Sequence, residues 1–373
     1  MAHTPTGKRP MHIVHTEASL GWGGQEIRIL TEAAGMIKRG HQVTLLCPPE
    51  AKIYHEAQAR NVPVVALPIG RKNLQGIMAM RRWLNANPAD VINTHSSTDS
   101  WLVAVASLGL KRTAPMVRTR HISAPISNNL TTRWLYQKAT RHIATTGELL
   151  RQQLIKQNGY APTQITSVPT GIDTEHFVPG DKTAAREKLG LPLDARIIGI
   201  VATLRSWKGH QYLFDAFAQL SDEHTRLVIV GDGPQRKTLQ ARIAELNLNG
   251  RVTMTGNQRD VLPWLQALDI FVLPSYANEG VPQAILQAML CGLPIVSTPI
   301  GSILEAVQHE QTGLIVEPKN SQQLHSAIIR LLQDAQFCQT LGAAARKRAL
   351  DRFGLDAMLD KMETIFTNAA SNG

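Results

Sequence analysis

Short apolar strands alternate with amphipathic helices throughout the second half of the chain, and this alternation restricts the fold more than any other feature. The run RIIGIVATL precedes the helical segment GHQYLFDAFAQL, and RLVIVGDG precedes RKTLQARIAELNL. The same order continues through RVTMTG, DIFVLPS and LPIVST to TGLIVEP. Apolar strands separated by helices are typical of a parallel sheet covered on both faces. We therefore expect a Rossmann-like α/β domain here.

The first half repeats this pattern less regularly. It begins with the strand MHIVHTEA, a tight GWGG turn and the helical stretch QEIRILTEAAGMIKRG. Five strand-like runs follow: HQVTLLC, VPVVALPI, DVINTH, PMVRTRH and RHIATTG. The turn-rich segment SVPTGIDTEHFVPGDK has no helical period and is interpreted as a linker. We expect one Rossmann-like domain at 1–179, a second at 180–352 and a final helix at 353–373. Two such domains would face a central cleft, and ligands of open α/β sheets bind beyond the carboxyl ends of the strands.

The positive charge of the chain is confined to its first half. Up to Pro179 there are 20 Lys and Arg against 10 Asp and Glu, and from Gly180 onward there are 19 against 19. Such an excess favours an anionic membrane surface, a phosphorylated lipid or a polyanion as a partner, or it is an ordinary solvated surface. Nucleic acid is not expected, because only 5% of the residues are aromatic and no basic run is interleaved with aromatic residues.

Other features of the composition indicate an intracellular protein. No apolar run approaches the ~20 residues of a membrane span, and MAHTPTGKRP has no apolar signal core. The 3 cysteines are far apart and match neither a metal site nor a disulfide framework. We expect a cytoplasmic location and no metal.

The loop YANEGVPQ, between a strand and a helix, is the first candidate site. Pro282 suits the first helical position, so the amides near Gly280 and Val281 would form an anion site at the helix end. A carboxylate is poorly placed to bind phosphate, and Glu279 is predicted to accept hydrogen bonds from sugar hydroxyls, unless it only caps the helix. Gln287, further along the helix, can exchange hydrogen bonds with a ribose.

Three other loops carry candidate residues. Arg205 and Lys208 follow a strand and are predicted to clamp a diphosphate, or they form an ordinary surface pair. Gly23 and Gly24 allow a ligand close to a helix start; the GWGG pattern is not GxGxxG, so no nicotinamide cofactor is expected. His121 ends a strand and is either a ligand contact or a structural histidine.

Five motifs in a fixed order resemble one enzyme family. They are similar to the C-terminal half of the group 1 (GT4-like) glycosyltransferases. The five motifs are ATLRSWKGHQYLFDAF, VIVGDGP, VTMTGNQRDVLPWLQALDIFVLPS, NEGVPQAILQAMLCGLPIVST and TGLIVEP. The likeness covers about 160 residues, and GWGGQE and RTRH extend it loosely into the first half. The resemblance implies the GT-B fold, a final helix that crosses back to the first domain, and retaining sugar transfer from a nucleotide-sugar without a metal.

The resemblance also implies roles for individual residues. Arg205 and Lys208 would hold the donor diphosphate, Glu279 the donor sugar, and position 287 the ribose. Backbone amides around the segment Gly280, Val281 and Pro282 would contact the phosphates, although Pro282 itself has no N–H. His121 would lie near the transferred sugar, and Gly23 and Gly24 near the diphosphate and the acceptor.

Two positions depart from the family pattern. The family's E-x7-E ends in Gln287, which predicts weaker donor binding by about tenfold and not an inactive enzyme, since a hydrogen bond to a neutral group contributes less than one to a charged group. The family's common arginine, expected two residues before Leu204, is not in that frame: Thr203 precedes Leu204 and Arg205 follows it, so the role of Arg205 is less secure than that of Lys208.

The expected function follows from these residues. We expect a retaining hexosyltransferase that needs no cofactor, uses a nucleotide-sugar such as a UDP-hexose, and acts on a lipid-linked or anionic glycan acceptor such as a lipopolysaccharide core. The basic first domain would rest on the inner face of the cytoplasmic membrane. Two alternatives are a GT-B-fold epimerase or hydrolase of nucleotide-sugars, and a non-catalytic nucleotide-sugar-binding protein.

Overall fold

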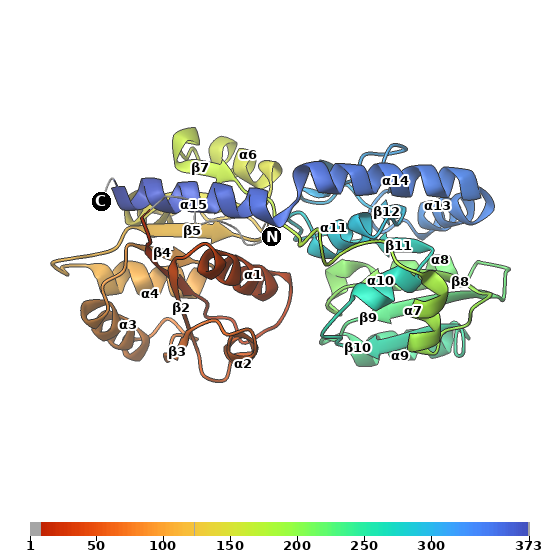
Figure 1. The fold of residues 1–373 in the computed structure, drawn as a ribbon, viewed down its shortest axis with the longest axis horizontal. Helices are drawn as coiled ribbons and strands as arrows, with labels where there is room; N and C mark the ends of the chain where they lie inside the picture. Colours follow the sequence, from red (N-terminus) through yellow and green to blue (C-terminus); the bar gives the residue numbers. More distant parts are fainter. Residues whose placement is uncertain (1–8, 123, 372–373) are drawn as a thin grey trace. The chain divides into compact units, whose positions relative to one another are not determined.

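The computed structural model describes residues 9–122 and 124–371 and contains two compact units (Figure 1). The first unit comprises the chain up to Gly171 and again from Asp356 onward, and the second is Ile172–Leu355. The boundary lies before the expected one at residue 179, because Ile172 and Phe177 are buried in the core of the second unit. Each unit is an open parallel sheet covered by helices, so the prediction of two Rossmann-like domains is confirmed.

The first unit is built on a seven-stranded sheet with the order β3-β2-β1-β4-β5-β6-β7. Its apolar strand residues, such as Val14, Ile92 and Ile143, are fully buried in the core. Its elements are β1 (His12–Thr16), α1 (Gly24–Lys38), β2 (Gln42–Cys47), α2 (Lys52–Ala59), β3 (Val64–Ala66), α3 (Leu74–Ala86), β4 (Val91–Thr94), α4 (Ser97–Ser107), β5 (Met116–Arg120), α5 (Leu130–Trp134), the π-helix η1 (Leu135–Ala139), β6 (Thr140–Thr145), α6 (Glu148–Lys156), the 3₁₀ turn η2 (Pro162–Gln164), β7 (Ile165–Ser167) and the final helix α15 (Leu355–Ser371).

The second unit is built on a six-stranded sheet with the order β10-β9-β8-β11-β12-β13. Ile198, Phe271 and Val296 lie in adjacent strands of its buried core. Its elements are α7 (Lys182–Leu189), β8 (Arg196–Val201), the 3₁₀ turn η3 (Ser206–Lys208), α8 (His210–Phe217), β9 (Thr225–Val230), α9 (Arg236–Glu245), β10 (Val252–Gly256), α10 (Leu262–Ala267), β11 (Ile270–Leu273), α11 (Gln283–Leu290), β12 (Ile295–Ser297), α12 (Ile303–Ala306), β13 (Gly313–Ile315), α13 (Ser321–Gln333) and α14 (Ala335–Arg352).

Helix α15 belongs to the first unit although it ends the chain, as Figure 1 shows. Arg39, at the end of α1, places its Nη1 2.7 Å from Oδ1 of Asp360 and 3.0 Å from Oε2 of Glu363. The apolar side of α15 is buried, including Met362 and Phe366. The predicted return of the final helix to the first domain is therefore confirmed.

Both sheets reverse their strand order at one position. In the first unit this position lies between β1 and β4, and in the second between β8 and β11. Helix α8 packs against α9 and α13, whereas α11 packs against α10 and α14. The loops after the two central strands therefore separate at the carboxyl edge, and such a switch point is where open α/β sheets bind ligands.

Candidate functional site

The switch point of the second unit contains an ion pair between two of the predicted site residues. Nζ of Lys208, in the loop after β8, lies 2.6 Å from Oε1 of Glu279, in the loop after β11. The hydroxyl of Ser275 donates to the same carboxylate oxygen over 2.6 Å. Glu279 is only 4% exposed, so its charge is compensated by these two partners and hardly by water.

The backbone holds these two loops together. The N–H of Tyr276 donates to the carbonyl of Trp207 over 2.8 Å, which joins the β11 loop to the β8 loop. Gly209 follows Lys208 in the left-handed region with φ +77°, and a Cβ there would lie 2.0 Å from the carbonyl oxygen of Pro274. Only glycine fits this close approach, and it fixes where Lys208 enters the site.

The start of α11, where an anion site is predicted, differs from the prediction in one respect. Pro282 precedes the helix as its N-cap, with ψ 128°, and is not its first helical residue as predicted. Its ring fixes φ alone, and its extended ψ places the helix start at Gln283. Val281 is buried in the core, so only its backbone is available to a ligand. The amide end of the helix nevertheless lies directly beyond Glu279, as an anion site requires.

Within the described residues, neither Gln287 nor Arg205 forms a hydrogen bond or ion pair with Lys208 or Glu279. Gln287 is half-buried in α11, and its side-chain amide has no hydrogen-bond partner within the described residues. Arg205 is exposed, with its guanidinium 5.6 Å from the ring centre of Trp207. It lines a hollow of about 200 Å³ between α8 and α9, together with His210 and Arg242. The role of Arg205 in a diphosphate clamp stays a prediction.

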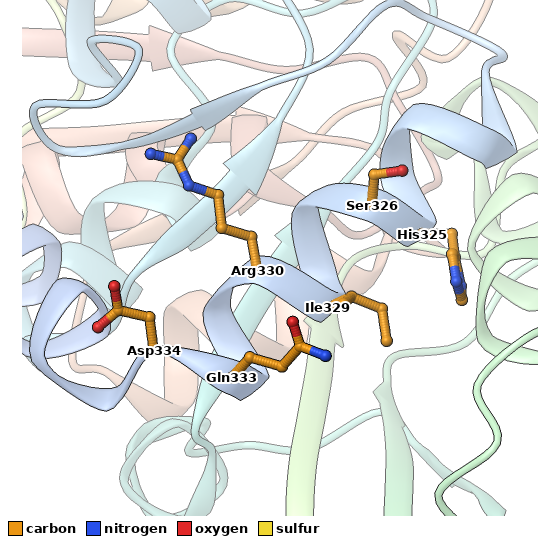
Figure 2. A pocket seen from close by; sticks show the side chains of 6 residues that line it. All are labelled: His325, Ser326, Ile329, Arg330, Gln333 and Asp334. Atoms are coloured by element: carbon orange, nitrogen blue, oxygen red, sulfur yellow. The ribbon is translucent and has the colours of Figure 1, made fainter.

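A larger hollow does not involve any predicted site residue. It has about 390 Å³ and runs along α13, where His325, Ser326, Ile329, Arg330, Gln333 and Asp334 line it (Figure 2). Arg330 also pairs with Glu310 there. This hollow is open to solvent, and none of the predicted catalytic or donor-binding residues lines it.

In the first unit the predicted residues lie around the β1–β4 switch point. Helix α1 begins at Gly24 with Gly23 as its N-cap, and no side chain caps it. His121 follows β5 directly and is half-buried. Gly23, Gly24 and His121 thus belong to the first unit, and the other seven predicted residues belong to the second.

The structure adds two histidines that sequence reasoning missed. His15 is the next-to-last residue of β1 and His95 follows β4; His15 Nδ1 lies 2.9 Å from His95 Nε2, and His95 Nδ1 lies 3.0 Å from His121 Nε2. All three pKa values are lowered, chiefly by burial, and that of His15 falls to about 3. The three rings are therefore neutral at physiological pH. Their common position at strand ends beside the switch point is the signal that could have revealed them.

Acidic residues at the same switch point are also buried. Asp99 accepts hydrogen bonds from the Thr16 hydroxyl over 2.8 Å and from the His95 amide over 2.9 Å, so it ties the ends of β1 and β4 together. Burial raises the pKa of Asp99. Burial also raises the pKa of Glu17 to about 8, with the Asp99 and Glu26 carboxylates adding to the effect.

Groups able to hold a metal ion are not found within residues 9–122 and 124–371. The three histidines bind to one another along a line and do not converge on one point. No helix in the described part of the chain is both long and apolar enough to cross a bilayer.

Two family models match consecutive parts of the chain. The model described as Glycosyltransferase Family 4 matches residues 22–176, and that described as Glycosyl transferases group 1 matches residues 181–348. The second match contains Lys208, Glu279 and Gln287, and the first contains Gly23, Gly24 and His121.

Individual relatives agree with the family models. A D-inositol 3-phosphate glycosyltransferase of Thermobispora bispora is 28% identical over 326 residues, which cover 79% of this chain and 74% of the relative. An Escherichia coli enzyme, UDP-Gal:alpha-D-GlcNAc-diphosphoundecaprenol alpha-1,3-galactosyltransferase, is 27% identical over 316 residues, covering 81% of each chain.

A solved structure shows the same fold. Anabaena HepE in complex with UDP-glucose superposes with a TM-score of 0.86 at 23% identity, over 96% of this chain and 100% of that chain. Together, the two parallel sheets, the returning helix α15 and the consecutive family matches show that the chain belongs to the group 1 glycosyltransferases of the GT-B fold.

Proposed function

We propose that this glycosyltransferase moves a hexose from a nucleotide-sugar, in the first instance a UDP-hexose, to an acceptor with retention of configuration and without a metal. The Lys208–Glu279 ion pair at the switch point carries the proposal. An ammonium has three N–H donors, and only one is needed for Glu279. Lys208 can therefore bind the donor diphosphate while it still neutralises the carboxylate beside it.

The charges at this site suit a departing nucleoside diphosphate. Negative charge grows on the phosphate as the sugar leaves, and Lys208 and the amide end of α11 are the counter-charges in place. Glu279 accepts hydrogen bonds from hydroxyls of the sugar, and Gln287 contacts the ribose. The leaving phosphate takes the acceptor's proton on the same face, so no side-chain base is required.

For the acceptor, we propose a lipid-linked or anionic glycan of the cell envelope, such as a lipopolysaccharide core. The relatives' names support an anionic acceptor, because one names an inositol phosphate and the other a diphosphate-linked lipid. The basic first unit supports it as well. Between Glu56 and Glu148 there are 12 Lys and Arg, and the acidic residues there are Asp90 and Asp99.

A membrane-facing surface on α3 fits this acceptor. Leu74 and Met78, one helical turn apart, are 70% and 43% exposed, and Leu108, after α4, is 57% exposed. Arg81 donates to the carbonyl of Leu108 over 2.6 Å and so fixes it against α3. We call these three apolar residues, with the exposed cations Arg71, Lys72, Arg82, Lys111 and Arg112, the α3 basic face. Its cations and exposed apolar side chains suit the inner leaflet of the cytoplasmic membrane.

Donor screening tests the proposed function. The purified chain is heated with UDP-, GDP- and ADP-hexoses, and the donor raises the melting temperature by mass action. The same donors are then incubated with lipid-linked and soluble glycan acceptors, with and without EDTA. Anomeric analysis of the product by NMR decides retention. Release of free sugar or an epimer without an acceptor would instead identify an epimerase or hydrolase, and binding without turnover would identify a non-catalytic binder.

A further inference from the structure

A continuous line of three imidazoles runs from the interior of the first unit to its surface. His15 is fully buried, His95 is 5% exposed and His121 is half-buried. The ring centres are 5.2 Å apart at both steps, and both nitrogen–nitrogen distances are hydrogen-bonding distances. Only His121 reaches the surface, so the other two act on any ligand through it.

Proton counting restricts the arrangement to two states. Each neutral imidazole has one N–H and one bare nitrogen, and each hydrogen bond uses one of each. All three rings therefore point their protons in the same direction along the line. In one state every proton is on Nδ1, and in the other every proton is on Nε2.

The inner end decides between these two states. Nε2 of His15 is buried and has no hydrogen-bond partner in the described part of the chain, and the Phe366 ring of α15 lies at 79° to the imidazole with the ring centres 6.3 Å apart. With protons on Nδ1, this end is an unused lone pair. With protons on Nε2, it is a buried N–H without an acceptor, which is the rarer situation in proteins. The Nδ1-protonated state is therefore favoured along the whole line.

We propose that His15 and His95 are positioning residues that hold His121 in its Nδ1–H tautomer, so that His121 offers a hydrogen-bond donor at the site. The inference rests on the proposed function and on the position beside the transferred sugar that the family resemblance implies for His121. Nδ1 of His121 has no partner among the described residues. It donates to an oxygen of the sugar or of the acceptor, and it does not act as a base.

Neighbouring charges keep the line neutral. Buried Arg28 on α1 and Arg118 on β5 lower the pKa values of His95 and His121 in addition to burial, and Arg120 also lowers that of His121. A protonated ring within the line would have no bare nitrogen with which to accept its neighbour's hydrogen bond. The positive surroundings therefore keep the rings neutral, so their N–H groups all point in the same direction along the line.

Nitrogen-15 NMR of histidine-labelled protein tests the proposal directly. At neutral pH, His121 should show a protonated Nδ1 and a bare Nε2, with its signals assigned by loss in His121→Gln. His95→Phe, which keeps a ring but removes both hydrogen bonds, should convert His121 to a mixture of tautomers. His142→Phe is the matched control, since His142 contacts Thr166 on β7 and lies outside the line. A protonated Nε2 in the unmodified protein, or an unchanged tautomer in His95→Phe, overturns the proposal.

Kinetics supply the second readout. We expect His95→Phe to lower kcat about fivefold to tenfold with an unchanged KM for the donor, and His95→Gln to recover part of the loss, because an amide can accept and donate. If His95→Phe fails to fold, His15→Leu replaces it and should also release the tautomer of His121. If the unmodified protein transfers sugar and folded His95→Phe has the same kcat, this proposal is overturned and the proposed function is not affected. No transfer with any donor overturns the proposed function, while the NMR result still decides the tautomer.

Discussion

Nζ of Lys208 and Oε1 of Glu279 are 2.6 Å apart, although 71 residues separate them in the sequence. The contact joins the two loops at which the second sheet reverses its strand order. A buried carboxylate normally weakens an adjacent phosphate site by repulsion. Here the lysine lies on the carboxylate, so under the proposed function the pair presents hydrogen-bond acceptors for a sugar and donors for a diphosphate from one place.

Lys208→Ala should lower kcat about 100-fold, because removal of one preorganised donor from a developing anion has an effect of that size. The matched control is Lys182→Ala, whose ammonium forms an ion pair of the same 2.6 Å length with Asp269 in the same unit. Steady-state rates with the identified donor check the prediction. Turnover within threefold of the unmodified enzyme would remove Lys208 from the site.

Gln287→Glu should retain transfer and tighten donor binding by about tenfold, because a charged acceptor forms a stronger hydrogen bond with a ribose hydroxyl. Gln287→Met, which keeps the length of the side chain and removes its hydrogen bonds, should weaken binding. Isothermal titration of the donor into each variant measures the difference. Equal affinities in all three proteins would place position 287 away from the ribose.

Gly301→Ala should disturb the backbone under Glu279. A Cβ at Gly301 would lie 2.0 Å from the carbonyl oxygen of Glu279, and φ is +58°. Gly250→Ala is the control, since its φ is +82° and nothing lies within 4 Å of a Cβ there. The control should lose ~1–2 kcal/mol of unfolding free energy from the left-handed conformation alone.

Gly301→Ala should lose more stability than this control in urea unfolding, and it should also lose transfer activity. The control should keep its activity. Equal losses of stability in the two variants would mean that the Glu279 backbone adjusts to the methyl group without difficulty.

Much of this arrangement follows from local sequence patterns. Every strand expected from the apolar runs is present in the described chain, because a continuous Val and Ile run between helices has few other solutions. Strand β7 was not expected, because Ile165–Ser167 contains a single apolar residue and shows no strand-like pattern. The positions of Lys208 and Glu279 in strand-to-helix loops could be predicted, but their 2.6 Å contact depends on the order of β8 and β11.

The positions of the three histidines at strand ends could be read from the sequence, but the contacts between the rings could not be predicted, for the same reason. His15, His95 and His121 lie at the ends of strands that are adjacent only in the folded sheet, and β1 and β4 are separated in sequence by two other strands. No spacing in the sequence encodes that neighbourhood. The helix start at Gln283 differs from the prediction by one residue because proline restricts φ and leaves ψ open.

The stability of the protein should fall as pH rises through about 8, and Glu17 should be a cause. Burial raises the pKa of Glu17 to about 8 from its ordinary value of 4.5. Between those values the folded state keeps a proton that the unfolded state has released, so the free energy of unfolding decreases with rising pH. The slope contributed by one such group is at most ~1.4 kcal/mol per pH unit.

Glu17→Gln should flatten this slope, and exposed Glu187→Gln should leave it unchanged. Urea unfolding between about pH 7 and pH 9 measures it, a range above the titration of the buried histidines. Burial also raises the pKa of Glu32, to about 7, so part of the slope should persist in Glu17→Gln. Identical slopes in Glu17→Gln and the unmodified protein would show that Glu17 is ionised when folded.

The α3 basic face should bind anionic vesicles reversibly. Each cation near an anionic surface contributes about 1 kcal/mol, so three or four are sufficient, and the attraction decays over a Debye length of ~8 Å at physiological salt. Co-sedimentation with anionic vesicles should therefore be strong at low salt and weak at high salt, and neutral vesicles should bind little.

Leu74→Glu and Arg82→Glu should each reduce binding to anionic vesicles, because the first repels the lipid phosphates and the second also removes a cation. Leu193→Glu is the control, since Leu193 is 51% exposed in the second unit. Equal binding to neutral and anionic vesicles, or equal losses in all three variants, would make the charge an ordinary solvated surface and would favour a soluble acceptor.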